Sequence, residues 1–138
     1  MAGFTFRYRL SGGAPTIQKI ISADTAFKAG DLVNLESGQA DLAVTTDANL
    51  MGVVLGTYSG LTAGTSKVDV ITDGDAVYGV ADANARAIGA PLDIAGATGA
   101  QGVAASTNKE FVVAADSTAA QETLVRFNVG KHYQNKAQ

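Results

Sequence analysis

The 138-residue chain has no cysteine and no tryptophan, a single histidine and only two prolines. Without cysteine it can form no disulfide, no thiolate metal site and no cysteine nucleophile. His132 has no second imidazole with which to build a facial metal site, and no Gly-x-Ser-x-Gly motif presents a nucleophilic serine. We therefore expect a protein that is not an enzyme and that binds no cofactor and no metal ion, with His132 as a solvated side chain near the C-terminus.

Long apolar runs are absent as well. No segment approaches the length of a membrane span, and the first residues alternate in polarity instead of forming the apolar core of a signal peptide. We expect a soluble, unsecreted protein with no membrane contact. A chain of this length corresponds to one domain that buries roughly two-thirds of its unfolded surface, enough to fold without disulfides.

The charges are distributed unevenly along the chain. All 13 acidic residues lie between Asp24 and Glu122, together with only four basic residues. The ends hold the remaining bases, which are Arg7, Arg9, Lys19, Arg126, Lys131 and Lys136. This asymmetry predicts an acidic body whose uncompensated basic ends contact an acidic protein surface. A net charge of −3 argues against a nucleic-acid partner.

The N-terminal segment has the period of an extended strand. Aromatic and aliphatic residues from Phe4 to Leu10 alternate with Thr5, Arg7 and Arg9, so one face is apolar and the other cationic. One interpretation is an ordinary strand of the domain's own sheet. The other is an arm that docks on a partner, and the flexible Ser-Gly-Gly-Ala-Pro joint at 11–15 favours it.

The rest of the chain is typical of an all-β protein, because short Val- and Ile-rich stretches alternate with Gly, Asp, Asn and Ser. Asp73-Gly74 between two such stretches predicts a two-residue hairpin joining 67–72 to 75–80. Other candidate strands are 17–21, 32–35, 40–44, 51–58, 91–94, 110–114 and 123–129. Their spacing suits a small single-domain β-barrel or β-sandwich, with helical turns expected only at 82–87 and 117–121.

Segments 29–35 and 88–94 resemble each other, because each places a glycine turn before a strand. The glycine-rich stretch 96–102 that follows the second is expected to be a mobile surface loop, because small residues bury little and cost entropy to order. It lacks the helix and lysine of a phosphate-binding loop.

Five segments in a fixed order resemble the small capsid cement, or head decoration, proteins of tailed bacteriophages. The resemblance covers roughly residues 22–129 and rests on 29–33, 49–54, the 68–78 hairpin, 88–92 and 122–127. It implies a compact β domain, without catalysis, that binds the outside of an expanded head as trimers and stabilises it against internal pressure. The implied partner is the major capsid protein of the same phage. The implied location is the outer capsid surface of the virion, after synthesis in the host cytoplasm.

Together these observations predict an N-terminal arm and joint at 1–15, a β domain at 16–129 and a basic C-terminal tail at 130–138. The predicted capsid contacts are Phe4, Phe6, Arg7, Tyr8, Arg9, Arg126, Lys131, His132 and Tyr133. A glycan-binding or fibre-associated β module is the alternative, for which Tyr58 beside Ser59-Gly60 is the one candidate aromatic platform.

Overall fold

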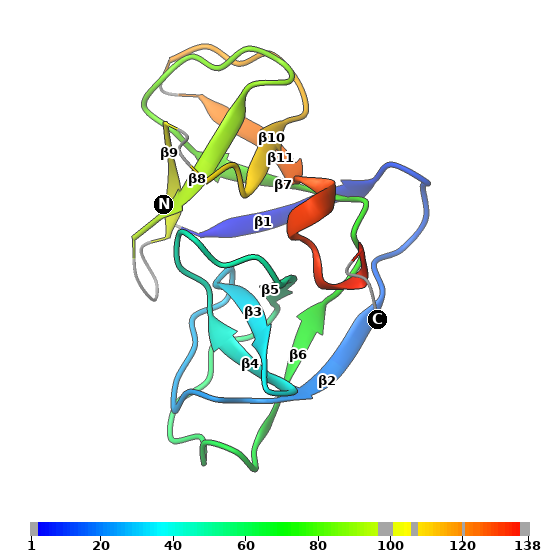
Figure 1. Cartoon of the computed structure of the whole chain (residues 1–138), viewed down its shortest axis with the longest axis vertical. Coiled ribbons are helices and arrows are strands. Elements are labelled where there is room, and N and C mark those ends of the chain that lie inside the picture. The colour runs from blue at the N-terminus through cyan, green and yellow to red at the C-terminus, as the bar shows by residue number, and fades with distance from the viewer. Residues whose placement is uncertain (1–2, 97–100, 106–107, 120, 136–138) are drawn as a thin grey trace.

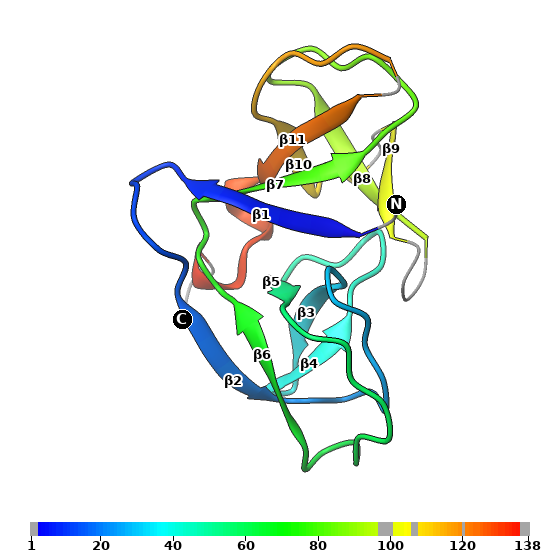
Figure 2. The same cartoon turned by 180° about the vertical axis from the view of Figure 1, so that it is seen from behind.

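The computed structural model describes residues 3–96, 101–105, 108–119 and 121–135. It confirms the all-β prediction: two antiparallel sheets lie one above the other in Figures 1 and 2. The six-stranded sheet has the order β1-β7-β11-β10-β8-β9, and the five-stranded sheet has the order β2-β6-β5-β3-β4. The strands are β1 (Phe4–Arg9), β2 (Ile17–Ile21), β3 (Leu32–Glu36), β4 (Gln39–Leu42), β5 (Leu50–Val54), β6 (Lys67–Ile71), β7 (Ala76–Ala81), β8 (Pro91–Ala95), β9 (Gly102–Ala105), β10 (Phe111–Val113) and β11 (Glu122–Phe127).

The two sheets repeat one five-stranded arrangement. Adding five to each strand number of the order β2-β6-β5-β3-β4 gives β7-β11-β10-β8-β9, the order found in the other sheet. The loops match too: Phe27 and Tyr58 exchange backbone hydrogen bonds between them, and so do Arg86 and Ser117 at the equivalent point. The sequence similarity between 29–35 and 88–94 therefore reflects a structural repeat. Of the described strands, β1 alone lies outside the two repeats.

Both repeats enter their second strand, β3 or β8, through a left-handed glycine. Gly30 has φ +94° and Gly89 has φ +84°, a conformation that side chains with a Cβ rarely adopt. Gly30 N donates to Val54 O, and Gly89 N donates to Val113 O, at 2.9 Å in each case. These turns explain why the same Gly-containing pattern appears twice in the sequence.

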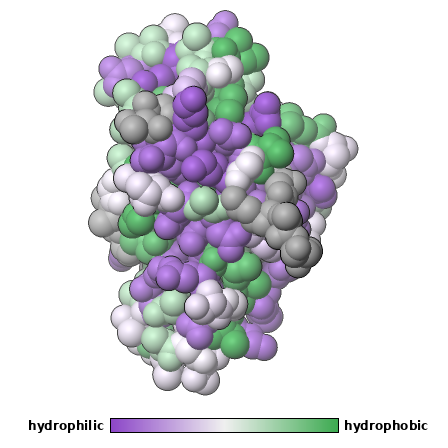
Figure 3. All heavy atoms as spheres, in the orientation of Figure 1, coloured by the Kyte–Doolittle hydropathy of each residue, from purple (hydrophilic) through white to green (hydrophobic). Residues whose placement is uncertain are grey.

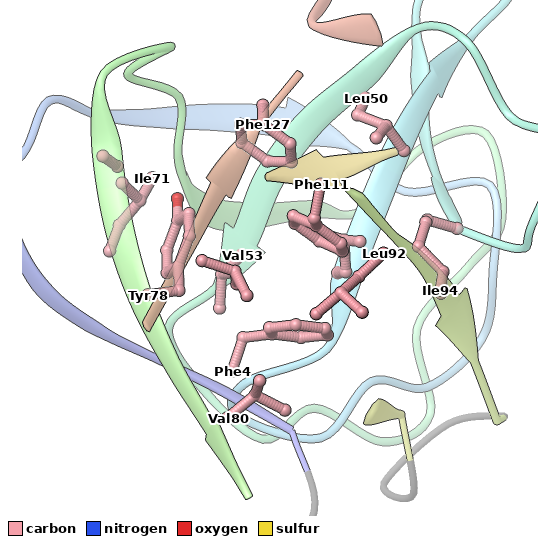
Figure 4. Packing of buried hydrophobic residues seen from close by; sticks show 14 of the residues in the cluster. Phe4, Leu50, Val53, Ile71, Tyr78, Val80, Leu92, Ile94, Phe111 and Phe127 are labelled. Atoms are coloured by element: carbon pink, nitrogen blue, oxygen red, sulfur yellow. The ribbon is translucent and has the colours of Figure 1, made fainter. Parts of the chain in front are cut away.

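The main hydrophobic core lies between the two sheets and draws on both (Figure 4). Phe4 of β1 stacks on Phe111 of β10 with ring centroids 5.2 Å apart, and Phe111 stacks on Phe127 at 5.6 Å. Tyr78 meets Phe127 edge-on at 5.9 Å. A second core cluster, which includes Phe27, Met51 and Val70, belongs to the five-stranded sheet.

The predicted N-terminal arm is wrong, because residues 4–9 form a strand of the six-stranded sheet. Phe4 pairs with Val80 and Arg9 with Ala76, with a register shift around Arg7. Phe4 is only 2% exposed. Withdrawing the strand would uncover the aromatic core, so the hydrophobic effect holds it in the domain. The alternative interpretation, a strand of the domain's own sheet, is the correct one.

The predicted hairpin at Asp73-Gly74 is also wrong. β6 pairs with β2 and β5, whereas β7 pairs with β1 and β11, so this connection carries the chain from one sheet to the other. The predicted helical turns at 82–87 and 117–121 are likewise not helical among the described residues. Arg86 and Ser117 instead form an isolated antiparallel bridge.

Candidate partner-contact site

The predicted contact residues at the N-terminus face in different directions. Phe4 lies in the core, and Phe6 is half-buried, with its ring edge-on to Tyr78 at 6.3 Å. The ring of Phe4 is closed to a partner, whereas that of Phe6 packs against the core and keeps part of its surface exposed. Tyr8, beyond the register shift, is 44% exposed.

The N-terminal arginines are compensated within the domain, contrary to the prediction of uncompensated basic ends. Arg7 Nε donates to Glu122 Oε1 at 2.8 Å, and a second guanidinium nitrogen contacts Glu122 Oε2. Arg9 Nε donates to Asp75 Oδ1 at 3.0 Å, and Lys19 pairs with Asp69 at 3.0 Å. Basic residues in the first two strands therefore form ion pairs with acidic residues of the rest of the domain.

The connection between the sheets at Asp73–Asp75 contacts segments from both ends of the chain. Asp73 Oδ2 accepts a hydrogen bond from Thr16 N at 2.6 Å, and Asp73 Oδ1 lies 3.5 Å from an Arg9 nitrogen. Asp75 accepts from Ser11 Oγ at 2.5 Å and from Ser11 N at 3.0 Å. Burial raises the pKa of Asp75, but the hydrogen bonds from Ser11 and Arg9 outweigh it and lower that pKa to about 2.

The C-terminal segment packs against this same connection. Two 3-10 turns, η1 (Val129–Lys131) and η2 (Tyr133–Asn135), flank His132, whose side chain is fully buried. Its Nε2 donates to Met51 O at 3.0 Å, and a Cβ at position 74 would lie 3.1 Å from its Nδ1.

The prediction of a solvated His132 is wrong. The ring lies 5.1 Å from that of Phe127 and 4.9 Å from that of Tyr133, which is itself half-buried against the core of the five-stranded sheet. Burial lowers the pKa of His132, because desolvation disfavours the imidazolium ion. The C-terminal segment up to Asn135 is thus part of the folded domain.

Three predicted residues take part in neither core cluster nor in an ion pair among the described residues: Tyr8, which is exposed, and Arg126 and Lys131, which are half-buried. The side chains of Arg126 and Lys131 make no ion pair with the described part of the chain. Because β1 and β11 both run antiparallel to β7, their C-terminal ends lie at the same end of the six-stranded sheet.

Two apolar side chains that were not predicted follow those strand ends. Leu10 is 57% exposed and Val129 is 62% exposed. We call the surface formed by Tyr8, Leu10, Val129 and Lys131 the β1–β11 end. In Figure 3, apolar spheres are scattered among hydrophilic ones on the face shown and do not merge into one sheet-wide patch.

Gln101 is a second residue that the sequence interpretation missed. It lies in the predicted surface loop 96–102, yet it is only 1% exposed. Its Oε1 accepts from Leu32 N at 2.5 Å, and its Nε2 donates to Ala43 O at 2.9 Å. The side-chain amide thereby joins the second repeat to the first by hydrogen bonds. Residues 97–100 of that loop lie outside the described residues.

Other site classes find no support in the residues described. No group of three His, Asp or Glu side chains among them is placed to hold a metal ion, and no described helix is long and apolar enough to cross a membrane. A surface depression of about 450 Å³ lies over β1, β7 and β11 and contains the Arg7–Glu122 ion pair.

Comparison with models of protein families gives no match for this sequence, and comparison with curated proteins finds no significantly similar one.

Proposed function

We propose that this chain is a structural head-decoration protein, which binds the outer surface of an expanded phage head and stabilises it without catalysis. Four of the five segments that carry the resemblance to this family fall on turns and strands of the two repeats. The fifth, 68–78, is not the hairpin on which the resemblance relied, because β6 and β7 lie in different sheets. Residues 29–33 and 88–92 are the equivalent glycine turns and strands, and 122–127 is β11. The resemblance thus rests on elements that define the domain.

The observation that carries the proposal is the β1–β11 end. Leu10 and Val129 are largely exposed at one end of the sheet, with Tyr8 and Lys131 beside them. Exposed apolar side chains next to Lys131, which makes no ion pair with the part of the chain that is described, suit an apolar protein surface with acidic residues at its edge. Since Phe4 and Phe6 are engaged in the domain, the capsid contact comes from this folded surface and not from an arm.

Capsid lattices also explain how a modest contact surface suffices. Decoration proteins of the resembled family bind as trimers, and several linked weak contacts give strong retention. A site that spans neighbouring capsid subunits is complete only after the shell expands, which makes binding specific for the mature head.

Co-sedimentation with expanded, undecorated heads of the encoding phage tests the proposal, with unexpanded heads as the comparison. We expect saturable binding to expanded heads alone. The double variant L10S/V129S should bind at least about tenfold more weakly, because each side chain buries an apolar area worth about 1–2 kcal/mol. I88S is the matched control, since Ile88 is 64% exposed at the opposite end of the sheet.

Two results would count against this proposal. If the wild-type protein bound neither kind of head, the decoration function would be wrong. If I88S weakened binding while L10S/V129S did not, the function would stand but the contact surface would be misplaced.

The surroundings of Tyr58 do not favour the glycan-binding alternative. Tyr58 is half-buried against the core of the five-stranded sheet, and its hydroxyl accepts a hydrogen bond from Asp69 N at 3.1 Å. Its ring lies over Gly56, where a Cβ would come within 3.3 Å. Tyr58 is thus a packed residue and not an open platform for a sugar ring.

A further inference from the structure

The two repeats differ at one sheet edge. In the six-stranded sheet, β7 has β11 on one side and β1 on the other. The equivalent strand of the other repeat, β2, pairs with β6 alone among the described strands. Figures 1 and 2 show β2 at the margin of its sheet with no other strand outside it.

The backbone of β2 offers hydrogen-bonding groups on this open side. Thr16 O accepts from Thr72 N at 3.1 Å, and Ser22 N donates to Ser66 O at 2.8 Å, so these residues direct their groups toward β6. In an antiparallel ladder the intervening residues Ile17 and Lys19 direct their N–H and C=O groups to the other side. Ile21, the next residue in this series, adjoins the parallel bridge between Ser22 and Ala40 of β4.

The open stretch is short and well defined. At Ser22 the edge closes, because Ser22 forms a parallel bridge with Ala40 of β4 and Ala23 N donates to Ala40 O at 2.8 Å. Within it, Ile17 is 51% exposed although its cross-strand neighbour Ile71 is buried. An unpaired edge with exposed apolar side chains is the usual template for an added strand.

The charges near this edge differ in sign from those in the other repeat. Arg7 of β1 reaches across Gly79 to Glu122 of β11. Ile21 pairs with Lys67 as Ala81 pairs with Glu122, so Lys67 occupies the position of Glu122. By the same register Lys19 occupies the position of Gly79, and its ammonium pairs with Asp69 at 3.0 Å. The side chain of Lys67 is exposed and makes no ion pair with any described residue.

We propose that the open edge of β2 binds an extended segment of a partner protein in which apolar residues alternate with Asp or Glu. The segment pairs antiparallel with β2 at the place that β1 takes beside β7, and its carboxylates face Lys67. The inference rests on the two repeats alone and does not depend on the capsid function.

A second copy of this chain fits the edge less well. Its β1 would bring Arg7 against Lys67, and β2 pairing with β2 about its centre would set Lys19 opposite Lys19. Like charges directly opposite each other destabilise a strand pair. Charge therefore selects an acidic partner strand over self-association.

Titration of the full-length protein with two ten-residue peptides tests the proposal, one alternating Val and Glu and the other alternating Val and Lys. Amide NMR shifts and hydrogen exchange report the site. We expect saturable changes and slowed exchange at Ile17 and Lys19 with the acidic peptide, and about fivefold weaker binding of the basic one.

The variant K67E should reverse this preference. K28E makes the same change of charge at an exposed lysine outside the edge and should leave the preference as it is. Failure of the acidic peptide to perturb the amides of Ile17 and Lys19 would overturn the proposal. So would protection of these amides in the protein alone together with a dimer in sedimentation, because that result assigns the edge to a second copy.

Discussion

Arg7 and Glu122, 115 positions apart in the chain, form an ion pair directly over Gly79 of the strand that lies between them. The Nε to Oε1 distance is 2.8 Å. A Cβ on Gly79 would lie 2.1 Å from Glu122 Oε1, so the pair occupies the space that a side chain on β7 would need. The glycine, the arginine and the glutamate are therefore one structural unit, which joins the first strand to the last.

This relationship predicts that G79A and E122A are not additive. G79A should displace the Glu122 carboxylate and lower the free energy of unfolding by about 1 kcal/mol, the upper range for an exposed ion pair. In an E122A background the same substitution should cost almost nothing, because the clash is gone. Urea unfolding of the four proteins of the cycle measures this, and full additivity would contradict it.

Phe4 should behave as a core residue. F4A is expected to cost about 3–5 kcal/mol of unfolding free energy, since Phe4 stacks within the core between the sheets. Y8A removes a neighbouring aromatic ring that is 44% exposed and should cost under about 1 kcal/mol. Deleting residues 1–9 should abolish the cooperative thermal transition, and a truncated protein that still unfolds cooperatively would restore the arm interpretation.

Gly52 of β5 should tolerate no side chain. A Cβ there would lie 1.5 Å from the backbone oxygen of Ile71, which cannot move without displacing β6. We expect G52A to cost about 3 kcal/mol or more. G102A is the control, because Gly102 also lies in a strand and a Cβ there meets nothing within 4 Å. The unfolding midpoint of G102A in urea should stay near that of the wild type.

Asp41 gives the stability a pH dependence opposite to that of most carboxylates. Burial and the nearby Asp24 and Glu36 raise the pKa of Asp41 to about 6. The folded state therefore binds more protons than the unfolded state between about pH 4 and 6, and stability falls as pH rises through that window. D41N should stabilise the protein by about 1 kcal/mol at pH 8, allowing for partial exposure, and hardly at all at pH 3.5.

Thermal unfolding of D41N and wild type at the two pH values measures this effect. An equal gain at both pH values would mean that repulsion of the Asp41 carboxylate is not its cause.

His132 should act in the reverse sense. Burial lowers its pKa below that of the unfolded chain, near 6.5, so the unfolded state takes up the proton first. Stability should decline as pH falls below about 6.5. Comparing D41N with D41N/H132Q from pH 8 to pH 5 isolates this contribution, because the opposing effect of Asp41 is removed. Parallel curves for the two proteins would place the imidazole in solvent.

Strand positions were largely predictable from the sequence. The prediction for 17–21 matches β2. The predictions for 32–35 and 91–94 end one residue before β3 and β8 do, respectively. β9 was missed because three of its four residues are Gly or Ala, and Val103 is its only residue of the β-branched or aromatic type that marks a strand. Its pairing with β8 decides its conformation.

The candidate site was less predictable. The pattern of residues 4–10 identified an extended strand, but alternation is the same for a core strand and a docking strand. Which of them it is depends on β7 and the aromatic core. Val129 and Leu10 gave no signal in the sequence, because exposure of a single apolar residue depends on where the neighbouring strands end.

By itself, the sequence determined the all-β class, most of the strand positions and the glycine turns, because strand alternation and left-handed backbone are local properties. Only the tertiary structure decided that β6 and β7 enter different sheets, that Arg7 and Arg9 are neutralised by Glu122, Asp73 and Asp75, and that His132 is buried. Each of these depends on contacts between residues far apart in the chain, whose partners are selected by packing of the shared core and not by neighbouring residues.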